Sequence, residues 1–525
     1  MPMNVLVRRN FLVSATLLCL AGCDRQTEEP EKPNIIYVLA DDMGYGDVSA
    51  FNADSKIKTP FIDQLATEGM MFTDAHSGSS VCTPTRYGIL TGRYSWRTRL
   101  KEGVLSGNSK PLIAADRTTI GSMLQKNGYY TAFIGKWHLG WDWGLKDEQA
   151  RSPTPWSVDF SNINYALPVK NSAKERGFDF SYGHPASLDM SPYVYVENGM
   201  VTAVPDTTTV NTGEYSWWRE GPTAPDFVHE EVTPNYFKKA MALVEDRALS
   251  DQPFFLYLAL PSPHTPILPT KEWQEKSGLN PYGDFVMMID DYVGQLMRTI
   301  KAAGIEENTL VIFTSDNGFA PYANFELLEA KGHYPSGPFR GYKADIFEGG
   351  HRIPFIAKWP GVIESGSVSS QTICLTDLMA TCADIAGHKL APNEGEDSYS
   401  LLPIFKQTIS SEPLREGTVH HSMNGSFAIR RGPWKLILCP DSGGWSDPKP
   451  QDSVAVAGLP AIQLYHLAND PGEKRNLEAE QPGKVAELKA LLAKYIQNGR
   501  STAGETQKND SYEGEWVQVN FIKQP

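Results

Sequence analysis

The chain has 525 residues, of which 41% are hydrophobic and 21% charged, a composition typical of a globular protein with more than one domain. The formal net charge of −14 gives no reason to expect binding to nucleic acid. An acidic protein that handles an anionic substrate must gather lysines, arginines or a metal ion at one place. The six cysteines include no C-x-x-C pair and indicate no disulfide framework.

The first residues predict an export signal. The pair Arg8-Arg9 precedes an apolar run over residues 11–20 that is too short to span a bilayer permanently. Leu20-Ala21-Gly22-Cys23 resembles a bacterial lipobox, in which Cys23 is lipidated and becomes the mature N-terminus. The alternatives are a plain cleaved signal peptide and a twin-arginine signal. We expect a lipoprotein signal peptide over residues 1–23, a polar tether over 24–32, and a lipid-anchored protein in the periplasm or at the cell surface.

Buried strands alternate with helical segments through most of the chain. Residues 34–40, 254–260 and 310–314 are continuous apolar runs, the pattern of parallel strands buried on both faces. The segments between them favour helices, and these are residues 61–68, 119–127, 235–249 and 285–303. This alternation predicts an α/β fold with a mostly parallel sheet sandwiched by helices, which we assign to residues 33–405.

Two regions depart from this alternation. Residues 145–235 are rich in Pro, Ser, Asn and Tyr, with little periodicity, and we expect long loops there. Residues 427–431 and 434–439 indicate antiparallel strands, and 484–498 an amphipathic helix. We therefore predict a smaller α+β subdomain over residues 406–525.

The most distinctive motif is Cys82-Thr83-Pro84-Thr85-Arg86, followed by Leu90-Thr91-Gly92-Arg93. A buried cysteine before a proline that begins a helix would be the simplest interpretation of the first part. The whole motif, however, resembles the signature of type I sulfatases, in which the cysteine is oxidised to Cα-formylglycine. Other segments resemble the same family, so the resemblance covers nearly all of residues 33–510; they are 135–140, 341–343, 348–352, 470–477 and 499–502. It implies an alkaline-phosphatase-like fold.

Carboxylates follow two of the buried strands. Asp41 and Asp42 end the first, and Asp316-Asn317 follows another. The carboxyl ends of parallel strands meet at the crevice where α/β proteins bind ligands, and these oxygen donors suit a hard cation. Capping of the following helices would be the alternative role. The resemblance implies that these residues and Cys82 hold one Ca²⁺, although the residues alone do not exclude Mg²⁺.

Lysines and histidines suited to catalysis lie on several loops. Lys136 and His138 follow a short apolar strand and, in extended backbone, would face the same side. The resemblance makes His264 a substrate-contacting histidine and Lys343 a catalytic cation.

Together with Arg86, these residues imply a mechanism. The formylglycine hydrate at position 82 supplies the attacking hydroxyl, and Arg86 and Lys136 stabilise its charge. His264 or Lys343 protonates the leaving alkoxide, and His138 takes the proton of the remaining hydroxyl. The nearby Glu348 and Arg352 are better explained as structural.

The substrate is less firmly indicated. Residues 177–193 resemble sulfatases acting on carbohydrate sulfates, some of them on 6-sulfated galactose or N-acetylgalactosamine. Trp217-Trp218 is compatible with a stacking platform or with core filler in a long loop. The candidate sugar-binding residues are His184, Asp189, His333 and Arg340, of which the last two are equally compatible with surface positions.

The sequence therefore predicts a sulfuric ester hydrolase that removes sulfate from a carbohydrate and depends on a formylglycine-generating maturation enzyme. One alternative is a formylglycine-dependent phosphonate or phosphodiester hydrolase. Another is a lipoprotein that binds sulfated glycans without cleaving them.

Overall fold

The computed structural model describes residues 1–3, 32–408, 412–510 and 516–523. Lys32–Pro525 form one compact unit. The lipidation site Cys23 and almost all of the predicted signal peptide and tether lie outside the described residues, so those assignments stay predictions. Within the described residues, no helix is long and apolar enough to cross a membrane.

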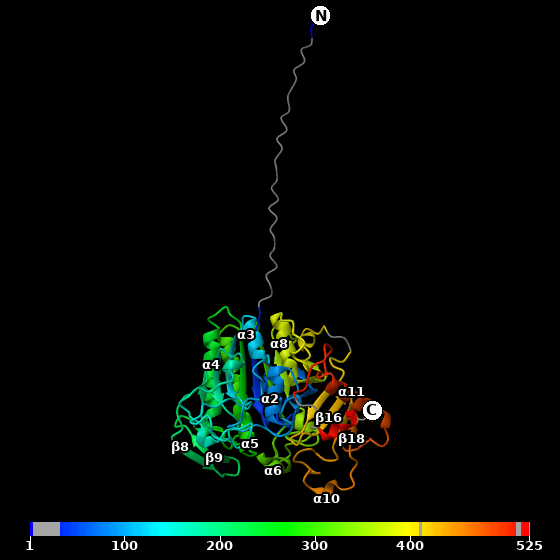
Figure 1. The fold of residues 1–525 in the computed structure, drawn as a ribbon. Coiled ribbons are helices and arrows are strands. Elements are labelled where there is room, and N and C mark those ends of the chain that lie inside the picture. The colour runs from blue at the N-terminus through cyan, green and yellow to red at the C-terminus, as the bar shows by residue number, and fades with distance from the viewer. Residues whose placement is uncertain (4–31, 409–411, 511–515, 524–525) are drawn as a thin grey trace. The chain divides into compact units, whose positions relative to one another are not determined.

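A large mixed sheet forms the centre of the molecule (Figure 1). Over the described residues it has ten strands in the order β13-β2-β12-β11-β1-β10-β4-β5-β6-β7. Its middle is parallel, as predicted: β11 (Thr309–Ser315), β1 (Asn34–Asp41), β10 (Phe254–Pro263), β4 (Tyr130–Lys136) and β5 (Phe180–His184). Antiparallel pairing appears toward the edges, at β12 (Phe355–Lys358), β2 (Met70–Phe72), β6 (Val196–Glu197) and β7 (Met200–Val201), while β13 (Ser367–Ser369) pairs parallel to β2.

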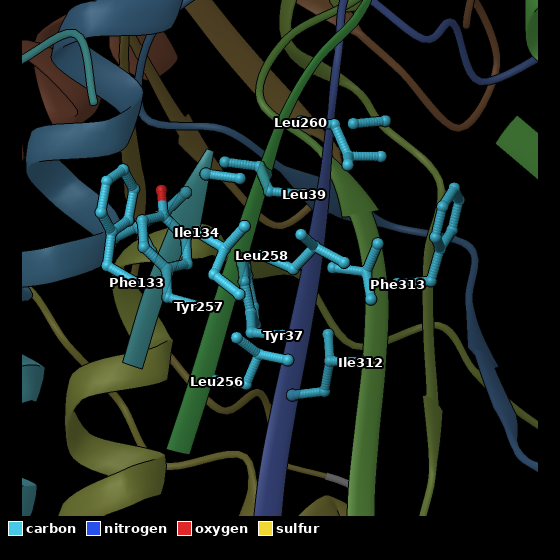
Figure 2. Packing of buried hydrophobic residues seen from close by; sticks show 14 of the residues in the cluster. Tyr37, Leu39, Phe133, Ile134, Leu256, Tyr257, Leu258, Leu260, Ile312 and Phe313 are labelled. Atoms are coloured by element: carbon cyan, nitrogen blue, oxygen red, sulfur yellow. The ribbon is translucent and has the colours of Figure 1, made fainter. Parts of the chain in front are cut away.

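The central strands are apolar because both of their faces are covered. Every residue of β1 is buried, and Tyr37 lies in register with Tyr257 on β10 and Ile312 on β11. Figure 2 shows how side chains from these neighbouring strands pack together. A close approach is also built in at Gly135 on β4, where a Cβ would lie 1.8 Å from the carbonyl oxygen of Ala259.

Two groups of helices flank this sheet. α1 (Pro60–Glu68), α4 (Val232–Arg247) and α5 (Pro281–Ala302) pack together in one group. α2 (Cys82–Thr91), α3 (Ile120–Lys126) and α8 (Leu378–Ala386) form the other. The predicted helices over residues 61–68, 119–127, 235–249 and 285–303 are all present, with ends shifted by a few residues.

The prediction of long loops over residues 145–235 is wrong in part. This region supplies β5 to the central sheet and forms a separate hairpin of β8 (Thr207–Asn211) and β9 (Trp218–Thr223). β5 is short and contains Ser, Gly and His, so it lacks the continuous apolar run that marks the other central strands.

The C-terminal part contains the predicted antiparallel sheet and helix. The strands are β15 (Thr418–His421), β16 (Phe427–Arg431), β17 (Trp434–Ile437) and β18 (Gln463–His466), and α11 (Pro482–Gln497) packs on them. The hydrophobic core of this C-terminal part also includes Tyr94 and Trp96, which come from the segment after α2, far earlier in the chain. The boundary between residues 405 and 406 stays a prediction.

Candidate active site

The carboxyl ends of the central parallel strands bring the predicted site residues together. β1 ends at Asp41, β4 ends at Lys136, and Asp316 follows the last residue of β11. Cys82 is the first residue of α2. Because neighbouring parallel strands end at one edge, segments far apart in sequence meet here.

An oxygen-rich group lies at the centre of the site. Asp41, Asp42, Asp316 and Asn317 are all fully buried. Asn317 Nδ2 donates to Asp42 Oδ1 at 2.7 Å, and Asp42 has the left-handed φ of 68°, a conformation uncommon for a non-glycine residue. Asp41 Oδ1 and Asn317 Oδ1 accept no hydrogen bond from any described residue. A buried acceptor left in this state costs about 1–3 kcal/mol, and a hard divalent cation would satisfy both oxygens.

Three cations surround these oxygens. Lys136 Nζ lies 2.6 Å from Asp41 Oδ2, Arg86 Nε donates to Asp316 Oδ2 at 3.0 Å, and Lys343 Nζ lies 2.7 Å from Asp42. We call the four oxygen-bearing residues and these cations the active-site cluster, which comprises Asp41, Asp42, Asp316, Asn317, Arg86, Lys136 and Lys343.

The electrostatics of this cluster are strongly perturbed. Burial would raise the pKa of Asp41, but Lys136, His264 and Arg86 hold that pKa well below its usual range. Burial and the neighbouring Asp41 raise the pKa of Asp316 to about 7. Burial opposes the charge on Lys343, yet Asp42 outweighs burial, so the pKa of Lys343 lies well above its ordinary value. Such shifts arise where carboxylates are crowded together out of water.

The Cys82 thiol is not activated as encoded. Cys82 is buried at the start of α2, and burial raises the pKa of its thiol despite the nearby Lys136 and Lys343. Since the thiolate is the nucleophilic form, an unmodified cysteine here would be a poor reagent. The described Cys374, Cys382 and Cys439 are also free and buried.

The two predicted catalytic histidines are held as neutral side chains. His138 has a left-handed φ of 55°, so the expectation that extended backbone aligns it with Lys136 is wrong. Its Nε2 donates to the Leu105 carbonyl at 2.7 Å, which leaves an unpartnered Nδ1 within the described structure. His264 Nδ1 donates to the Thr265 carbonyl at 2.5 Å, and its Nε2 lies 3.6 Å from Asp42 Oδ2. Burial is the largest cause that lowers the pKa of both rings.

Comparisons with known proteins show which family the chain resembles over most of its length. The sequence model of the Sulfatase family matches residues 33–388. The chain is 32% identical over 522 residues to N-acetylgalactosamine-6-O-sulfatase of Bacteroides thetaiotaomicron, covering 90% of this chain and 96% of that protein. It is 33% identical over 475 residues to arylsulfatase A of Homo sapiens, covering 88% and 86% respectively.

The chain belongs to the sulfatase family. A solved structure from work on glycosaminoglycan metabolism by Bacteroides thetaiotaomicron superposes with a TM-score of 0.76 at 31% identity, covering 88% of this chain and 99% of that chain. The predicted fold, a mixed sheet flanked by helices with a small C-terminal antiparallel sheet, is thereby confirmed, and the protein is a sulfatase.

The predicted sugar-binding residues of this sulfatase divide into two pairs. His184 lies beside Lys136 in the β4–β5 register, with an Nε2 that has no described partner, and Asp189 pairs with Arg219. His333 instead bonds Asp47 Oδ1 at 2.8 Å and is fully buried. Arg340 donates to the carbonyls of Glu473 and Asp447 at 3.0 and 3.3 Å. Because the contacts of His333 and Arg340 join loops of the protein itself, we leave both out of the proposed site.

A site residue that sequence reasoning missed is Tyr322. Its hydroxyl accepts a hydrogen bond from Lys343 Nζ at 3.2 Å and lies 3.5 Å from His264 Nε2. Tyr322 lies on a 3₁₀ turn, Pro321–Ala323, shortly after Asp316-Asn317. Proximity to that motif was the only sequence signal.

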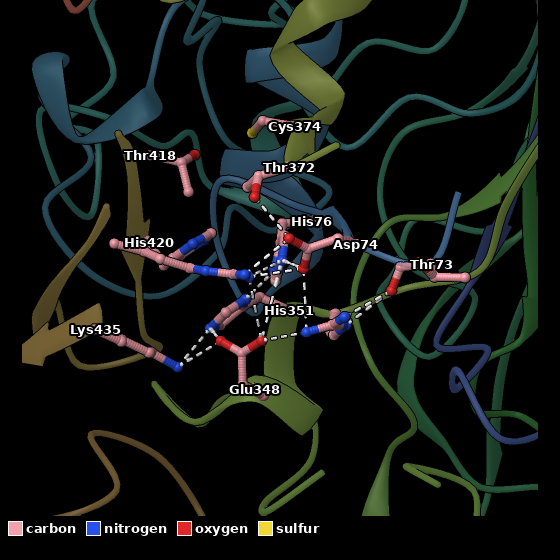
Figure 3. A network of polar contacts seen from close by, with 12 residues as sticks. Thr73, Asp74, His76, Glu348, His351, Thr372, Cys374, Thr418, His420 and Lys435 are labelled. Carbon is pink, nitrogen blue, oxygen red and sulfur yellow. Dashed lines mark hydrogen bonds and ion pairs between the residues drawn. The ribbon is translucent and has the colours of Figure 1, made fainter. Parts of the chain in front are cut away.

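A second buried group of charged side chains lies beside the loop that leads to Cys82, where His420 contacts the Ser77 carbonyl. Figure 3 shows the polar contacts of this group around His76 and Glu348. β3 (Ala75–His76) leads into this loop, and α7 (Glu348–His351) follows the Lys343 loop. Lys435 Nζ lies 3.1 Å from Glu348 and 2.9 Å from Glu473, while Arg430 lies 2.7 Å from Asp74. We call this group the support cluster, which comprises Asp74, His76, Glu348, His351, Arg352, His420, Arg430, Lys435 and Glu473.

The histidines of the support cluster do not form a convergent metal site, although His76, His351 and His420 lie close together. The rings of His351 and His420 stack at 3.9 Å with an interplanar angle of 7°, so their in-plane lone pairs cannot point at one ion. Lys435 contacts His351 Nε2 at 3.0 Å. Glu348 and Arg352 belong to this cluster, in keeping with a structural role.

Proposed function

We propose that this sulfatase removes sulfate esters from carbohydrates, with 6-O-sulfated galactose or N-acetylgalactosamine units as candidate substrates. The proposal is carried by the active-site cluster, which places lysines and unsatisfied oxygens around Cys82. The similarity to an N-acetylgalactosamine-6-O-sulfatase supports the choice of sugar sulfates.

We further propose that Cys82 is converted to formylglycine by a maturation enzyme and that Asp41, Asp42, Asp316, Asn317 and the modified residue hold one Ca²⁺. The donor set fits a hard cation, since it consists of buried oxygens of which two accept no hydrogen bond from described residues. When present, formylglycine would supply a hydroxyl nucleophile, and the ion would supply positive charge beside the sulfuryl group.

The chain's own residues supply binding and proton transfer. Lys136, Lys343 and His264 surround the position for the sulfuryl oxygens and balance their charge. Lys343 carries a proton for the leaving oxygen, because Asp42 keeps its pKa high against the effect of burial. Burial lowers the pKa of His264, which favours the neutral form of its ring in this geometry. His138 offers its unpartnered Nδ1 as the base for a proton at residue 82.

The test is sulfate release from a panel of defined sulfated monosaccharides and oligosaccharides. Mass spectrometry of the peptide containing Cys82 would establish its modification in the same preparation. We expect release from sugar 6-sulfates. Turnover of an aryl phosphodiester in preference to all sulfate esters would favour the phosphodiester hydrolase alternative, and sugar binding without release by modified protein would favour a binding protein.

We also propose export as a lipoprotein anchored through Cys23. The signal-like residues 8–23 support this, and they lie outside the described structure. Labelled fatty acid should be incorporated into the wild-type protein and not into a Cys23→Ala variant. Equal labelling of both proteins would contradict the proposal.

A further inference from the structure

Three aromatic side chains gather beside the buried catalytic residues. Trp217, Tyr322 and Trp445 are each partly buried and come from loops far apart in the sequence. The ring centroid of Tyr322 lies 6.5 Å from that of Trp217 and 5.7 Å from that of Trp445. We call these side chains the aromatic collar. They are more exposed than the neighbouring Lys343 and His264, which are both buried.

The collar contacts the catalytic groups directly. The Tyr322 hydroxyl accepts from Lys343 Nζ at 3.2 Å, and the Tyr322 ring lies 6.1 Å from the ring of His264. Since His264 Nδ1 already donates to the Thr265 carbonyl, its Nε2 is the acceptor that faces the Tyr322 hydroxyl at 3.5 Å. A group whose sulfate lies between Lys343 and His264 must therefore lie against Tyr322.

Each collar loop is fixed to a loop that carries catalytic residues. The backbone of the Trp217 loop is held where Ile267 N donates to Tyr215 O at 2.8 Å, next to His264. Lys343 N donates to Phe319 O at 2.8 Å, just before Tyr322. Trp445 N donates to Asp345 Oδ1 at 2.7 Å. These bonds fix the backbone that carries the three rings before a ligand arrives, which lowers the entropy cost of binding.

The two adjacent tryptophans that the sequence left undecided have different environments. Trp218 stacks on His229 at 3.9 Å, and its Nε1 donates to Thr209 Oγ1 at 3.1 Å, so it fills space within the hairpin region. Trp217 instead faces Tyr322 and has the guanidinium of Arg219 over its ring. Trp217 alone of this pair belongs to the collar.

We propose that the aromatic collar is a sugar-binding subsite for the pyranose ring that carries the sulfate ester; this rests on the proposed carbohydrate sulfatase function. The C–H face of a pyranose packs well on aromatic rings, and a galacto-configured ring, whose O4 is axial, leaves one such face uninterrupted. A sulfate on exocyclic C6 stands outside the ring, so it reaches Lys343 and His264 while the ring stays at the collar. A sulfate on a ring hydroxyl would draw the ring past Tyr322. The collar therefore favours 6-O-sulfates.

Trp217→Ala and Trp445→Ala, with the exposed Trp156→Ala as the matched control, test this subsite in full-length modified enzyme. We expect each collar variant to raise KM for galactose 6-sulfate by roughly ten-fold, in the range seen when an aromatic anchor is removed. Trp156 is 54% exposed and lies over Arg99, so its variant should match wild type. Tyr322→Phe keeps the ring and should keep KM within about two-fold while lowering kcat, whereas Tyr322→Ala should raise KM.

Calorimetric binding of galactose 6-sulfate to Cys82→Ala protein, with and without Trp217→Ala, separates this inference from the proposed function. Weaker binding in the Trp217→Ala variant supports the subsite, whether or not the wild-type enzyme releases sulfate. A wild-type enzyme that binds the sugar sulfate but releases no sulfate would overturn the proposed function alone. Sulfate release with unchanged KM and affinity in both tryptophan variants would overturn the subsite alone. Absence of both release and binding would overturn the two together. A KM that rises for 4-nitrophenyl sulfate but not for galactose 6-sulfate would also overturn it, since the collar would then bind aryl esters.

Discussion

The active-site cluster and the support cluster are both buried and rich in charge, but they are compensated differently. In the support cluster, Asp74, Glu348 and Glu473 each have a lysine or arginine nitrogen within 3.1 Å. In the active-site cluster, Asp41, Asp42 and Asp316 also have such a nitrogen within 3.0 Å, but Asp41 Oδ1 and Asn317 Oδ1 accept no hydrogen bond from described residues.

This difference separates a structural network from a binding site. A buried network whose carboxylates each lie against a lysine or arginine holds loops in place, and here it joins the strand that leads toward Cys82 to α7 and to the C-terminal sheet. A network with unsatisfied acceptors retains affinity for an ion or ligand that completes it. The loop of residues 77–81 connects the two, so the support cluster positions the active-site cluster.

The largest expected effect is on catalysis, through Cys82→Ala. Loss of the nucleophile that only the modified side chain provides should lower sulfate release by about 10⁴-fold or more. The variant should unfold at nearly the wild-type urea concentration, because the replacement is small. Wild-type activity in Cys82→Ala would contradict the assignment. Cys82→Ser is a weaker probe, since some maturation enzymes accept serine.

The next largest effect should be on stability, through Lys435→Met in the support cluster. Removing this cation leaves the buried Glu473 without the lysine at 2.9 Å and leaves Glu348 dependent on Arg352 at 3.1 Å, which costs about 3–5 kcal/mol. Urea unfolding measures the loss. Lys494→Met is the matched control, because its pair with Glu416 is exposed and should change stability by less than about 0.5 kcal/mol.

Adding Glu473→Gln to Lys435→Met should restore part of that stability, because burial and Glu348 already disfavour the charged form of Glu473 and its pKa is about 7. Equal losses for Lys435→Met and Lys494→Met would contradict the distinction between a buried network and a surface pair.

Removal of the proposed ion should affect the active-site cluster alone. Chelation to an ion-free state, verified by elemental analysis, should lower activity by about 100-fold, since the sulfuryl group loses the largest nearby positive charge. Added Ca²⁺ should restore activity and raise the unfolding temperature. Asn317→Ala should weaken Ca²⁺ binding in calorimetry. Full activity of enzyme shown to be free of ions would contradict the proposed Ca²⁺ site.

Much of the framework could be predicted because its signals are local. Residues 34–40, 254–260 and 310–314 are apolar throughout, and the structure places strands there, buried on both faces. Asp41, Asp316 and Lys136 could be predicted as neighbours because they end or follow parallel strands, which share one edge.

The rest depends on contacts that no local pattern encodes. Tyr322 lies on a short 3₁₀ turn and Trp445 on an irregular segment, and only the folded chain brings their ring centroids to within 5.7 Å. His138 departs from extended geometry through a left-handed residue, which the pattern of apolar positions does not reveal. β5 was not predicted from the sequence because it is short and partly polar.

The smallest predicted effect concerns the pH dependence of the support cluster. Burial first, and then neighbouring positive groups, hold the pKa of His420 well below its ordinary value of about 6.5. The unfolded chain therefore binds the proton that the folded protein excludes. The stability contribution is complete above about pH 6.5 and is lost as the pH falls below it, by up to about 1.4 kcal/mol per pH unit for one proton.

His420→Gln should remove up to one proton from this dependence while still allowing a side-chain donor to the Ser77 carbonyl, which His420 Nδ1 contacts at 3.1 Å. Urea unfolding of both proteins between pH 8 and pH 5 gives the comparison. The two stability curves should run parallel above pH 7 and converge on acidification, because the glutamine variant has one fewer group to protonate on unfolding. Curves that stay parallel down to pH 5 would contradict this prediction, because they would mean that His420 binds a proton equally well in the folded and the unfolded protein.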